Sequence, residues 1–168
     1  MFILVHTEMP KLVIVSLPRC GRNFIANELK KQGVHTEYQC VKTVDQLDNN
    51  ADVILAHDFN LDYYDPSRYI LRLNRSTEEC LRSWFLLDVR QNRVANTKKA
   101  WIKRKRTLSK YIYEFDKKYK YVDTIWFYNL LEHPNIILST ICSIIQYPYV
   151  WQDFPKHEPR DLNIFPFI

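Results

Sequence analysis

Glycine and regularly spaced cysteines are scarce in this chain. Only 2 of its 168 residues are glycine. They lack the spacing of a Walker A phosphate loop, which also requires a Lys-Ser or Lys-Thr pair that is absent. The cysteines are far apart with no C-x-x-C spacing, which argues against both a zinc site and a disulfide framework. There are 4 of them: Cys20, Cys40, Cys80 and Cys142.

Long apolar runs are also missing. No stretch approaches the roughly 18 apolar residues of a membrane span. The opening segment, MFILVHTEMP, has no cationic region, no long apolar region and no small-residue cleavage site of the kind found in signal peptides. We therefore expect a soluble, cytoplasmic protein with reduced cysteines, no bound metal and no membrane partner.

Length and composition favour one compact domain. With 168 residues, of which 46% are hydrophobic, the chain suits a single core and is too short for two. No repeat or low-complexity linker interrupts it. We expect one domain over residues 1–168, with a core at about 11–149 and an irregular C-terminal wrap over 150–168.

Short apolar runs alternate with helical patterns. Strands are expected at residues 11–16, 52–56, 69–73 and 122–127, with a weaker one at 34–39. Helices are expected at 23–31, 43–47, 77–89, 98–118 and 135–146. Continuous apolar strands separated by helices indicate a parallel sheet covered on both faces. The predicted fold is a three-layer α/β domain with a mostly parallel sheet of about 4 to 5 strands.

Three polar residues lie just past expected strand ends, where the ligands of such sheets bind. They are Arg19, His57 and Arg75, and the fold prediction gathers them at one edge of the sheet. A net charge of +5 and an isoelectric point near 9.0 favour an anionic ligand.

The junction after the first strand has the features of a phosphate-binding loop. An apolar run ends at Ser16, and a helical pattern begins directly after the turn that contains Gly21. The glycine permits a tight turn, and the free N–H groups of the next helix point together at an anion. Arg19 and Arg22 add fixed positive charge at the same place.

This junction resembles the 5′-phosphosulfate loop of the PAPS-dependent sulfotransferases, whose usual form is P-[KR]-S-G-[TS]-[TS]-x-[LVIW]. Pro18, Arg19 and Gly21 fit that form, whereas the three other loop positions lack the family's small hydroxyl residues. The resemblance implies a P-loop-like sulfotransferase fold.

The same resemblance assigns roles to the loop residues. Backbone N–H groups of Cys20, Gly21, Arg22 and Asn23 would hold the 5′-phosphate, helped by the Asn23 side chain. Phe24 takes the place of an aromatic residue that stacks on adenine in many soluble members, and a core position on the helix is the alternative.

A second strand-to-helix junction resembles the 3′-phosphate site of the same family. There, an Arg directly after the strand and a Ser eight positions later hold the 3′-phosphate, and Arg75 and Ser83 have this spacing. A forked cation and a hydroxyl donor suit a single dianion. Ser76 or Thr77 can cap the helix that carries the serine.

A third match concerns the last strand. Residues 128–130, Tyr-Asn-Leu, stand where the family has E-D-L, and we expect residues 128–134 to form a turn before the final helix. The acid of the family pattern is missing. The resemblance then covers roughly residues 11–149.

The resemblance implies transfer of a sulfuryl group from PAPS to a hydroxyl or amine acceptor, with release of PAP and without a metal. Arg19 would stabilise charge on the leaving nucleotide. His57 has the position of the catalytic histidine of cytosolic members, and its ordinary pKa, near 6.5, suits a base at neutral pH. Asp58 is the alternative base. The sequence does not identify the acceptor.

A basic segment lies within the expected helix 98–118. Leu108, Ile112 and Phe115 recur at helical spacing, so one face should be docked and the basic face should lie in water. A solvated surface, a clamp on the nucleotide, a guide for a polyanionic acceptor and a nucleic-acid surface all remain open. The basic residues are Lys98, Lys99, Lys103, Arg104, Lys105, Arg106 and Lys110.

Two other functions fit parts of the pattern. A P-loop-like nucleotide kinase is disfavoured by the missing Walker lysine and by the lack of a clear magnesium-binding aspartate after a strand. A non-enzymatic module on a degenerate sulfotransferase fold, binding nucleotide or nucleic acid, stays open because the loop hydroxyls and the late acid are absent. Nucleic acid is the less expected partner.

Overall fold

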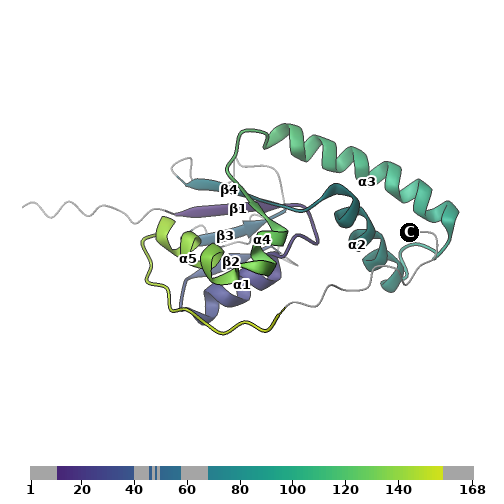
Figure 1. The fold of residues 1–168 in the computed structure, drawn as a ribbon. Coiled ribbons are helices and arrows are strands. Elements are labelled where there is room, and N and C mark those ends of the chain that lie inside the picture. The colour runs from purple at the N-terminus through teal and green to yellow at the C-terminus, as the bar shows by residue number, and fades with distance from the viewer. Residues whose placement is uncertain (1–10, 40–45, 47, 49, 58–67, 157–168) are drawn as a thin grey trace, which may run out of the picture.

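The computed structural model describes residues 11–39, 46, 48, 50–57 and 68–156. Within them lies a five-stranded sheet in the order β2-β3-β1-β4-β5 (Figure 1). Every neighbouring pair is parallel. The strands are β1 (Leu12–Ser16), β2 (Thr36–Tyr38), β3 (Val53–Ala56), β4 (Tyr69–Asn74) and β5 (Thr124–Trp126). The predicted parallel α/β sheet is therefore confirmed.

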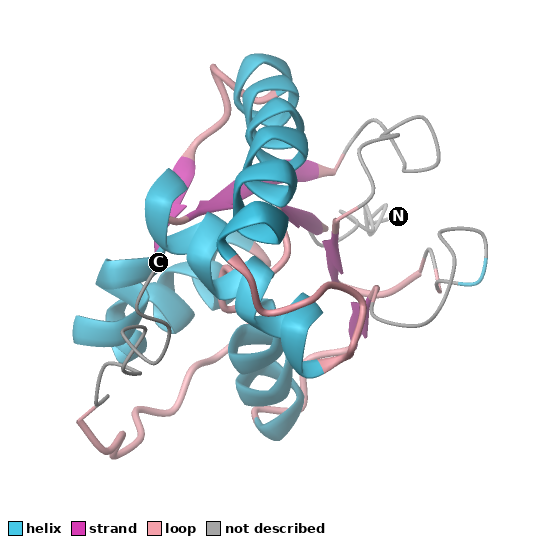
Figure 2. Cartoon of the chain, turned by 90° about the vertical axis from the view of Figure 1, so that its right-hand side faces the viewer, coloured by secondary structure: helices cyan, strands magenta, loops and turns pink. Residues whose placement is uncertain are grey.

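Helices cover the sheet on both sides. They are α1 (Arg22–Lys31), α2 (Thr77–Arg90), α3 (Lys98–Lys118), α4 (Phe127–Glu132) and α5 (Pro134–Ile144). Figure 1 shows α3 above the strands, α1 below them and α4 and α5 in front of them, and the turned view of Figure 2 also shows helices above and below the strands. The helix expected at residues 43–47 lies outside the described residues.

The central strand explains why the sheet is covered on both faces. Leu12, Val13, Ile14 and Val15 of β1 are all fully buried, on both sides of the pleat. A strand whose successive side chains point to opposite faces can bury all of them only between two layers of helix. No helix in the described part of the chain is long and apolar enough to cross a membrane.

The predicted turn at residues 128–134 is wrong, because a short helix, α4, begins at Phe127 directly after β5. Packing accounts for this helix. Leu130 is buried, and both Phe127 and Leu130 lie against Gly21 of the loop after β1. The helix ends at Glu132, and Pro134 then occupies the first turn of α5, where its fixed φ and missing N–H are tolerated.

Helix α3 docks through the face that its spacing predicts. Leu108, Ile112 and Phe115 are buried, together with Trp101. Two of its cations pair with acids of α2. Nε of Arg104 lies 2.7 Å from the carboxylate of Asp88, and Nζ of Lys105 lies 3.3 Å from that of Glu78. The five other basic residues of the segment are exposed: Lys98, Lys99, Lys103, Arg106 and Lys110.

The chain after α5 runs back along α1. The side-chain amide of Gln32 donates to the carbonyl of Val150 at 2.8 Å and accepts from its N–H at 3.2 Å. Further along, the Phe154 ring meets the Phe24 ring edge-on, with 5.6 Å between centroids. The described part of the C-terminal segment is thus fixed to the helix that follows the candidate phosphate loop.

Candidate anion-binding site

The sheet register places the predicted site residues at one edge. Val15 of β1 is opposite Ala56 of β3, and Ser16 is opposite Leu73 of β4. Because all three strands are parallel, the segments that follow them emerge from the same edge. Arg19 lies in the segment that follows β1, His57 in the segment that follows β3, and Arg75 between β4 and α2.

The loop between β1 and α1 has an unusual backbone. Arg19 has φ of 70° and Gly21 has φ of 93°, both in the left-handed region that residues with a Cβ seldom adopt. A Cβ added to Gly21 would also lie 3.0 Å from side-chain atoms of Leu130 and Phe127. Strain of this kind at Arg19 costs free energy, and it is typical of ligand sites.

The first turn of α1 begins directly after this loop. Gly21 is the residue that precedes the helix, and in the described structure no side chain caps this end. The first N–H groups of a helix need an acceptor, and a bound anion can supply one. The described geometry thus agrees with a phosphate-binding loop.

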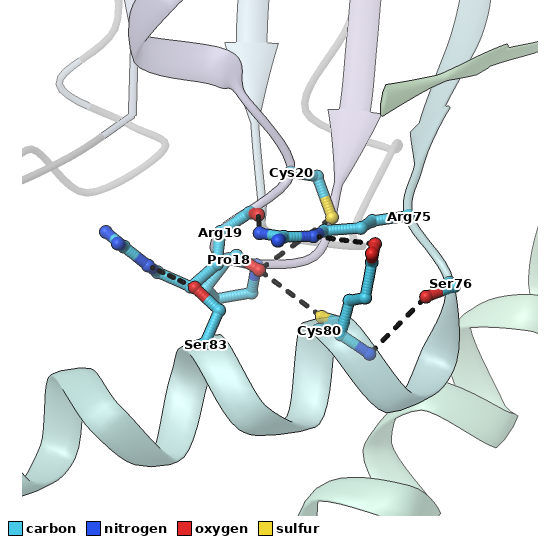
Figure 3. Close-up of polar contacts among 8 residues, drawn as sticks. Pro18, Arg19, Cys20, Arg75, Ser76, Cys80 and Ser83 are labelled. Atoms are coloured by element: carbon cyan, nitrogen blue, oxygen red, sulfur yellow. Dashed lines mark hydrogen bonds and ion pairs between the residues drawn. The ribbon is translucent and has the colours of Figure 1, made fainter. Parts of the chain in front are cut away.

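The two predicted phosphate motifs meet directly (Figure 3). Nε of Arg19, from the loop, donates a hydrogen bond of 3.2 Å to Oγ of Ser83 on α2. Ser83 is buried, and its hydroxyl accepts this bond while keeping its own proton to donate. The contact crosses 64 residues of sequence and joins the loop after β1 to α2.

Arg75 is held from three sides at the start of α2. One of its terminal N–H groups donates to the backbone carbonyl of Arg19 at 3.1 Å. Its guanidinium lies over the Phe127 ring, 4.5 Å from the centroid, and its Nε lies 3.4 Å from the carboxylate of Glu79. Ser76, one of the two caps that the sequence allows, caps the same helix by accepting the N–H of Glu79.

The other loop residues point in different directions. The Arg22 side chain is buried and lies over the Tyr38 ring, 5.4 Å from the centroid, so its charge is turned toward β2. Asn23 is exposed, and Phe24 is half-buried against Phe154. The roles of Arg22, Asn23 and Phe24 in binding a nucleotide stay predictions.

Two thiols lie beneath the loop. Sγ of Cys20 and Sγ of Cys80 each lie within hydrogen-bond distance of the carbonyl oxygen of Pro18, at 3.8 and 3.5 Å. A hydrogen bond between the two thiols raises the pKa of Cys20, and burial adds to the increase. The same hydrogen bond lowers the pKa of Cys80; burial opposes this effect and the positive charge of Arg75 reinforces it.

His57 lies at the end of β3, half-buried, with its backbone N–H donating to Oε1 of Gln39 at 3.1 Å. This bond fixes the chain at the point where it leaves the sheet. Asp58, the alternative base, lies outside the described residues. The proton-transfer role of His57 stays a prediction.

Sequence reasoning missed three residues of this site. Glu79 is four residues after Arg75 on a helix, a spacing that indicates an ion pair. Phe127 follows the carboxyl end of β5, so its place at the common edge was also open to prediction. No sequence signal pairs Cys80 with the loop cysteine, because that contact depends on how α2 packs.

Comparison with known proteins adds a finding about the fold. No protein-family model matches the chain, and no curated protein matches it in sequence. The crystal structure of a sulfotransferase from Alicyclobacillus acidocaldarius aligns with a TM-score of 0.60 at 15% identity, covering 92% of this chain and 88% of that one. The fold is sulfotransferase-like. At 15% identity, this similarity shows the fold alone, and any argument about function must come from the residues of the site.

Within the sulfotransferase-like fold, the edge of the sheet carries a concentration of positive charge. The Arg75 guanidinium donates to the backbone carbonyl of Arg19, and Glu79 is the acid that pairs with Arg75 in the described structure. No group of three or more potential metal ligands is found among the described residues. The donors at this edge are guanidinium, hydroxyl and backbone N–H groups, which are the groups that bind phosphate and sulfate.

Proposed function

We propose that this protein is a PAPS-dependent sulfotransferase, which moves a sulfuryl group from PAPS to a hydroxyl or amine acceptor and releases PAP. The observation that supports it most is the contact between Arg19 and Ser83, with Arg75 bonded to the same loop. It joins two motifs that resemble the 5′- and 3′-phosphate sites of that family. The sulfotransferase-like fold supports the proposal independently.

In this proposal, each phosphate of the nucleotide has its own donors. The uncapped N–H groups at the start of α1 and the Arg19 side chain bind the 5′-phosphate. Arg75 and the Ser83 hydroxyl bind the 3′-phosphate. Phe127 packs against the Arg75 guanidinium, so that less side-chain freedom is lost when the anion binds. The Glu79 carboxylate must give up its contact with Arg75 in the same step.

The transfer breaks the bond between sulfur and the bridging oxygen of the 5′-phosphate and forms a bond from sulfur to the acceptor oxygen or nitrogen. Arg19 stabilises the negative charge that develops on the bridging oxygen as a fixed cation, since guanidinium stays protonated. His57 takes the proton that the acceptor loses. Neither step uses a metal.

Thermal unfolding with PAP, ATP and AMP, each with and without magnesium, tests the binding part. Because the two arginines supply the countercharge, PAP should stabilise the protein without magnesium. At about 100 times its Kd, a ligand adds roughly 2.7 kcal/mol. A protein stabilised by magnesium-ATP and indifferent to PAP is instead a nucleotide kinase or phosphotransferase.

Turnover tests the transfer part. Release of PAP from PAPS should be followed across a panel of phenols, sugars and amines, because the acceptor is unidentified. Strong binding of PAP without turnover on any acceptor would favour a non-enzymatic nucleotide-binding module. The loop without its usual hydroxyl residues is the observation that keeps this second function in view.

A further inference from the structure

The two thiols beneath the phosphate loop belong to different parts of the site. Cys20 is in the loop itself, and Cys80 is in the first turns of α2, between Arg75 and Ser83 in sequence. Both side chains are about 1% exposed, and both sulfurs are directed at one oxygen, the carbonyl of Pro18 (Figure 3). Both sulfurs lie within hydrogen-bond distance of this oxygen, at 3.8 and 3.5 Å, and the two thiols interact with each other.

The surroundings make the two thiols unequal. Cys80 lies near the N-terminus of α2 and close to the positive charge of Arg75, and both features favour a thiolate. The hydrogen bond from the Cys20 thiol lowers the pKa of Cys80 further, and it keeps Cys20 protonated. Cys80 therefore has the thiolate character that reaction with an oxidant requires, and Cys20 beside it is placed to resolve the product. Both thiols are buried, so the oxidant must be as small as hydrogen peroxide to reach them.

We propose that Cys20 and Cys80 form a redox modification site, which a hydroperoxide converts to an intramolecular disulfide across the phosphate loop. The Cys80 thiolate attacks one oxygen of hydrogen peroxide and the O–O bond breaks. Hydroxide leaves and takes up a proton to become water, and Cys80 becomes a sulfenic acid. The Cys20 sulfur then attacks the Cys80 sulfur, the S–S bond forms, and the hydroxyl leaves as water. In total the two thiols lose two electrons and two protons, and hydrogen peroxide is reduced to two molecules of water.

The disulfide changes the loop because both sulfurs leave the Pro18 carbonyl. An S–S bond is about 2.05 Å long, so the Cys20 backbone is drawn toward α2. The N–H of Cys20 is one of the groups that would hold the 5′-phosphate, and Gly21 next to it is fixed against Leu130 and Phe127. Oxidation should therefore weaken nucleotide binding. This consequence rests on the proposed function, whereas formation of the disulfide does not.

The test uses the full chain, reduced and then treated with hydrogen peroxide. Peptide mapping without reductant should show one crosslink between the peptides of Cys20 and Cys80, with a loss of about 2 Da that dithiothreitol reverses. The Cys80→Ser and Cys80→Ala proteins should form no such crosslink. Cys142 is an internal control, since burial raises its pKa to about 11 and its thiol stays protonated.

Binding of PAP by the reduced, oxidised and re-reduced protein then tests the consequence. We expect oxidation to weaken the binding of PAP at least about tenfold, which corresponds to the loss of one charge-assisted hydrogen bond. Dithiothreitol should restore the affinity. The Cys80→Ser protein should keep its affinity after the same peroxide treatment, which separates the disulfide from damage elsewhere.

Different failures have different meanings. Oxidation of either cysteine to sulfinic or sulfonic acid without a crosslink, or a crosslink to another cysteine, would overturn the proposal. A crosslink that leaves PAP affinity unchanged would overturn its effect on the loop. A reduced protein that never binds PAP would count against the proposed function alone, because the crosslink is read by mass.

Discussion

Nε of Arg19 donates a hydrogen bond of 3.2 Å to Oγ of Ser83, and this bond joins the loop after β1 to the second turn of α2. It fixes the two side chains relative to each other, and so it preorganises this part of the site. A preorganised site loses less side-chain freedom on binding than one that must assemble. The bond also means that Ser83 can affect the position of Arg19, in addition to any direct contact with a ligand.

The first prediction separates the two phosphate sites. Arg75→Ala and Ser83→Ala should weaken the binding of PAP far more than the binding of adenosine 5′-phosphosulfate, which lacks a 3′-phosphate. A hydrogen bond to a charged group contributes about 1.5–3 kcal/mol, so Arg75→Ala should cost at least roughly tenfold in Kd by titration calorimetry. Equal losses for the two nucleotides would refute the assignment of Arg75 and Ser83 to the 3′-phosphate.

Arg82 offers a matched control for that experiment. It precedes Ser83 on α2, and its Nε pairs with Glu78 at 3.1 Å, away from the loop contacts. Arg82→Ala removes one positive charge from the same helix, so it corrects for the general electrostatic effect. Its PAP affinity should change by less than about threefold, since exposed ion pairs are worth little.

The second prediction concerns Glu79, whose carboxylate lies 3.4 Å from Nε of Arg75. This acid competes with a bound phosphate for the same guanidinium. Glu79→Gln should therefore tighten the binding of PAP several-fold, because it removes a negative charge whose repulsion of the phosphate is worth on the order of 1 kcal/mol. Glu78→Gln, one residue earlier and paired with Arg82 and Lys105, is the control. If Glu79→Gln weakens PAP, the carboxylate orients Arg75 and does not compete.

The third prediction uses the two glycines as a pair. Gly21 has φ of 93°, and an added Cβ would meet Leu130 and Phe127 at 3.0 Å. Gly33 has φ of 87°, and an added Cβ would meet the Tyr147 hydroxyl at 2.8 Å. Either change to Ala should lower the free energy of unfolding by about 1–3 kcal/mol. Only Gly21→Ala should also abolish PAP stabilisation, measured at a temperature where both proteins are folded.

The sheet and the long helices follow from local sequence patterns. Every strand expected in the described region is present, because continuous apolar runs such as residues 12–16 can be satisfied only by burial on both faces. The short helix α4 was missed, since six residues show no period and Phe127 favours a strand by propensity. Its contacts with Gly21, far away in sequence, decide its conformation.

The sequence predicts where the candidate site lies in the fold, but it does not predict which side chains contact one another there. Chain topology places Arg19, His57 and Arg75 at one edge, which needs only the order of the strands. The hydrogen bond from Arg19 to Ser83 depends on side-chain rotamers that no sequence pattern specifies. For the same reason, spacing alone did not indicate that the Arg22 guanidinium turns toward Tyr38.

The fourth prediction tests how α2 is attached to α3. The Asp88 side chain is fully buried, with Arg104 at 2.7 Å and Arg93 at 3.5 Å. Asp88→Asn removes the charge at constant size, so chemical denaturation should show a loss of about 1–3 kcal/mol in the free energy of unfolding. Glu78→Gln, whose side chain is half exposed, should cost about 0.5 kcal/mol or less. Equal costs would mean that the buried carboxylate has no special structural role.

The last prediction separates an enzyme from a binding module, and it concerns His57. If its imidazole takes the acceptor proton, His57→Ala should leave PAP affinity nearly unchanged. Sulfuryl transfer should fall by about 10²–10⁴-fold, the usual contribution of a positioned base.

A structural histidine would behave differently, because His57 lies where β3 ends and its backbone is bonded to Gln39. Its removal would then lower the melting temperature and weaken binding and turnover together. Gln39→Ala is the matched control, since it removes the hydrogen bond that fixes this stretch and keeps the imidazole. Turnover that survives in His57→Ala would exclude this base and point to Asp58. Loss of stability in both variants with equal loss of binding would assign His57 to the fold.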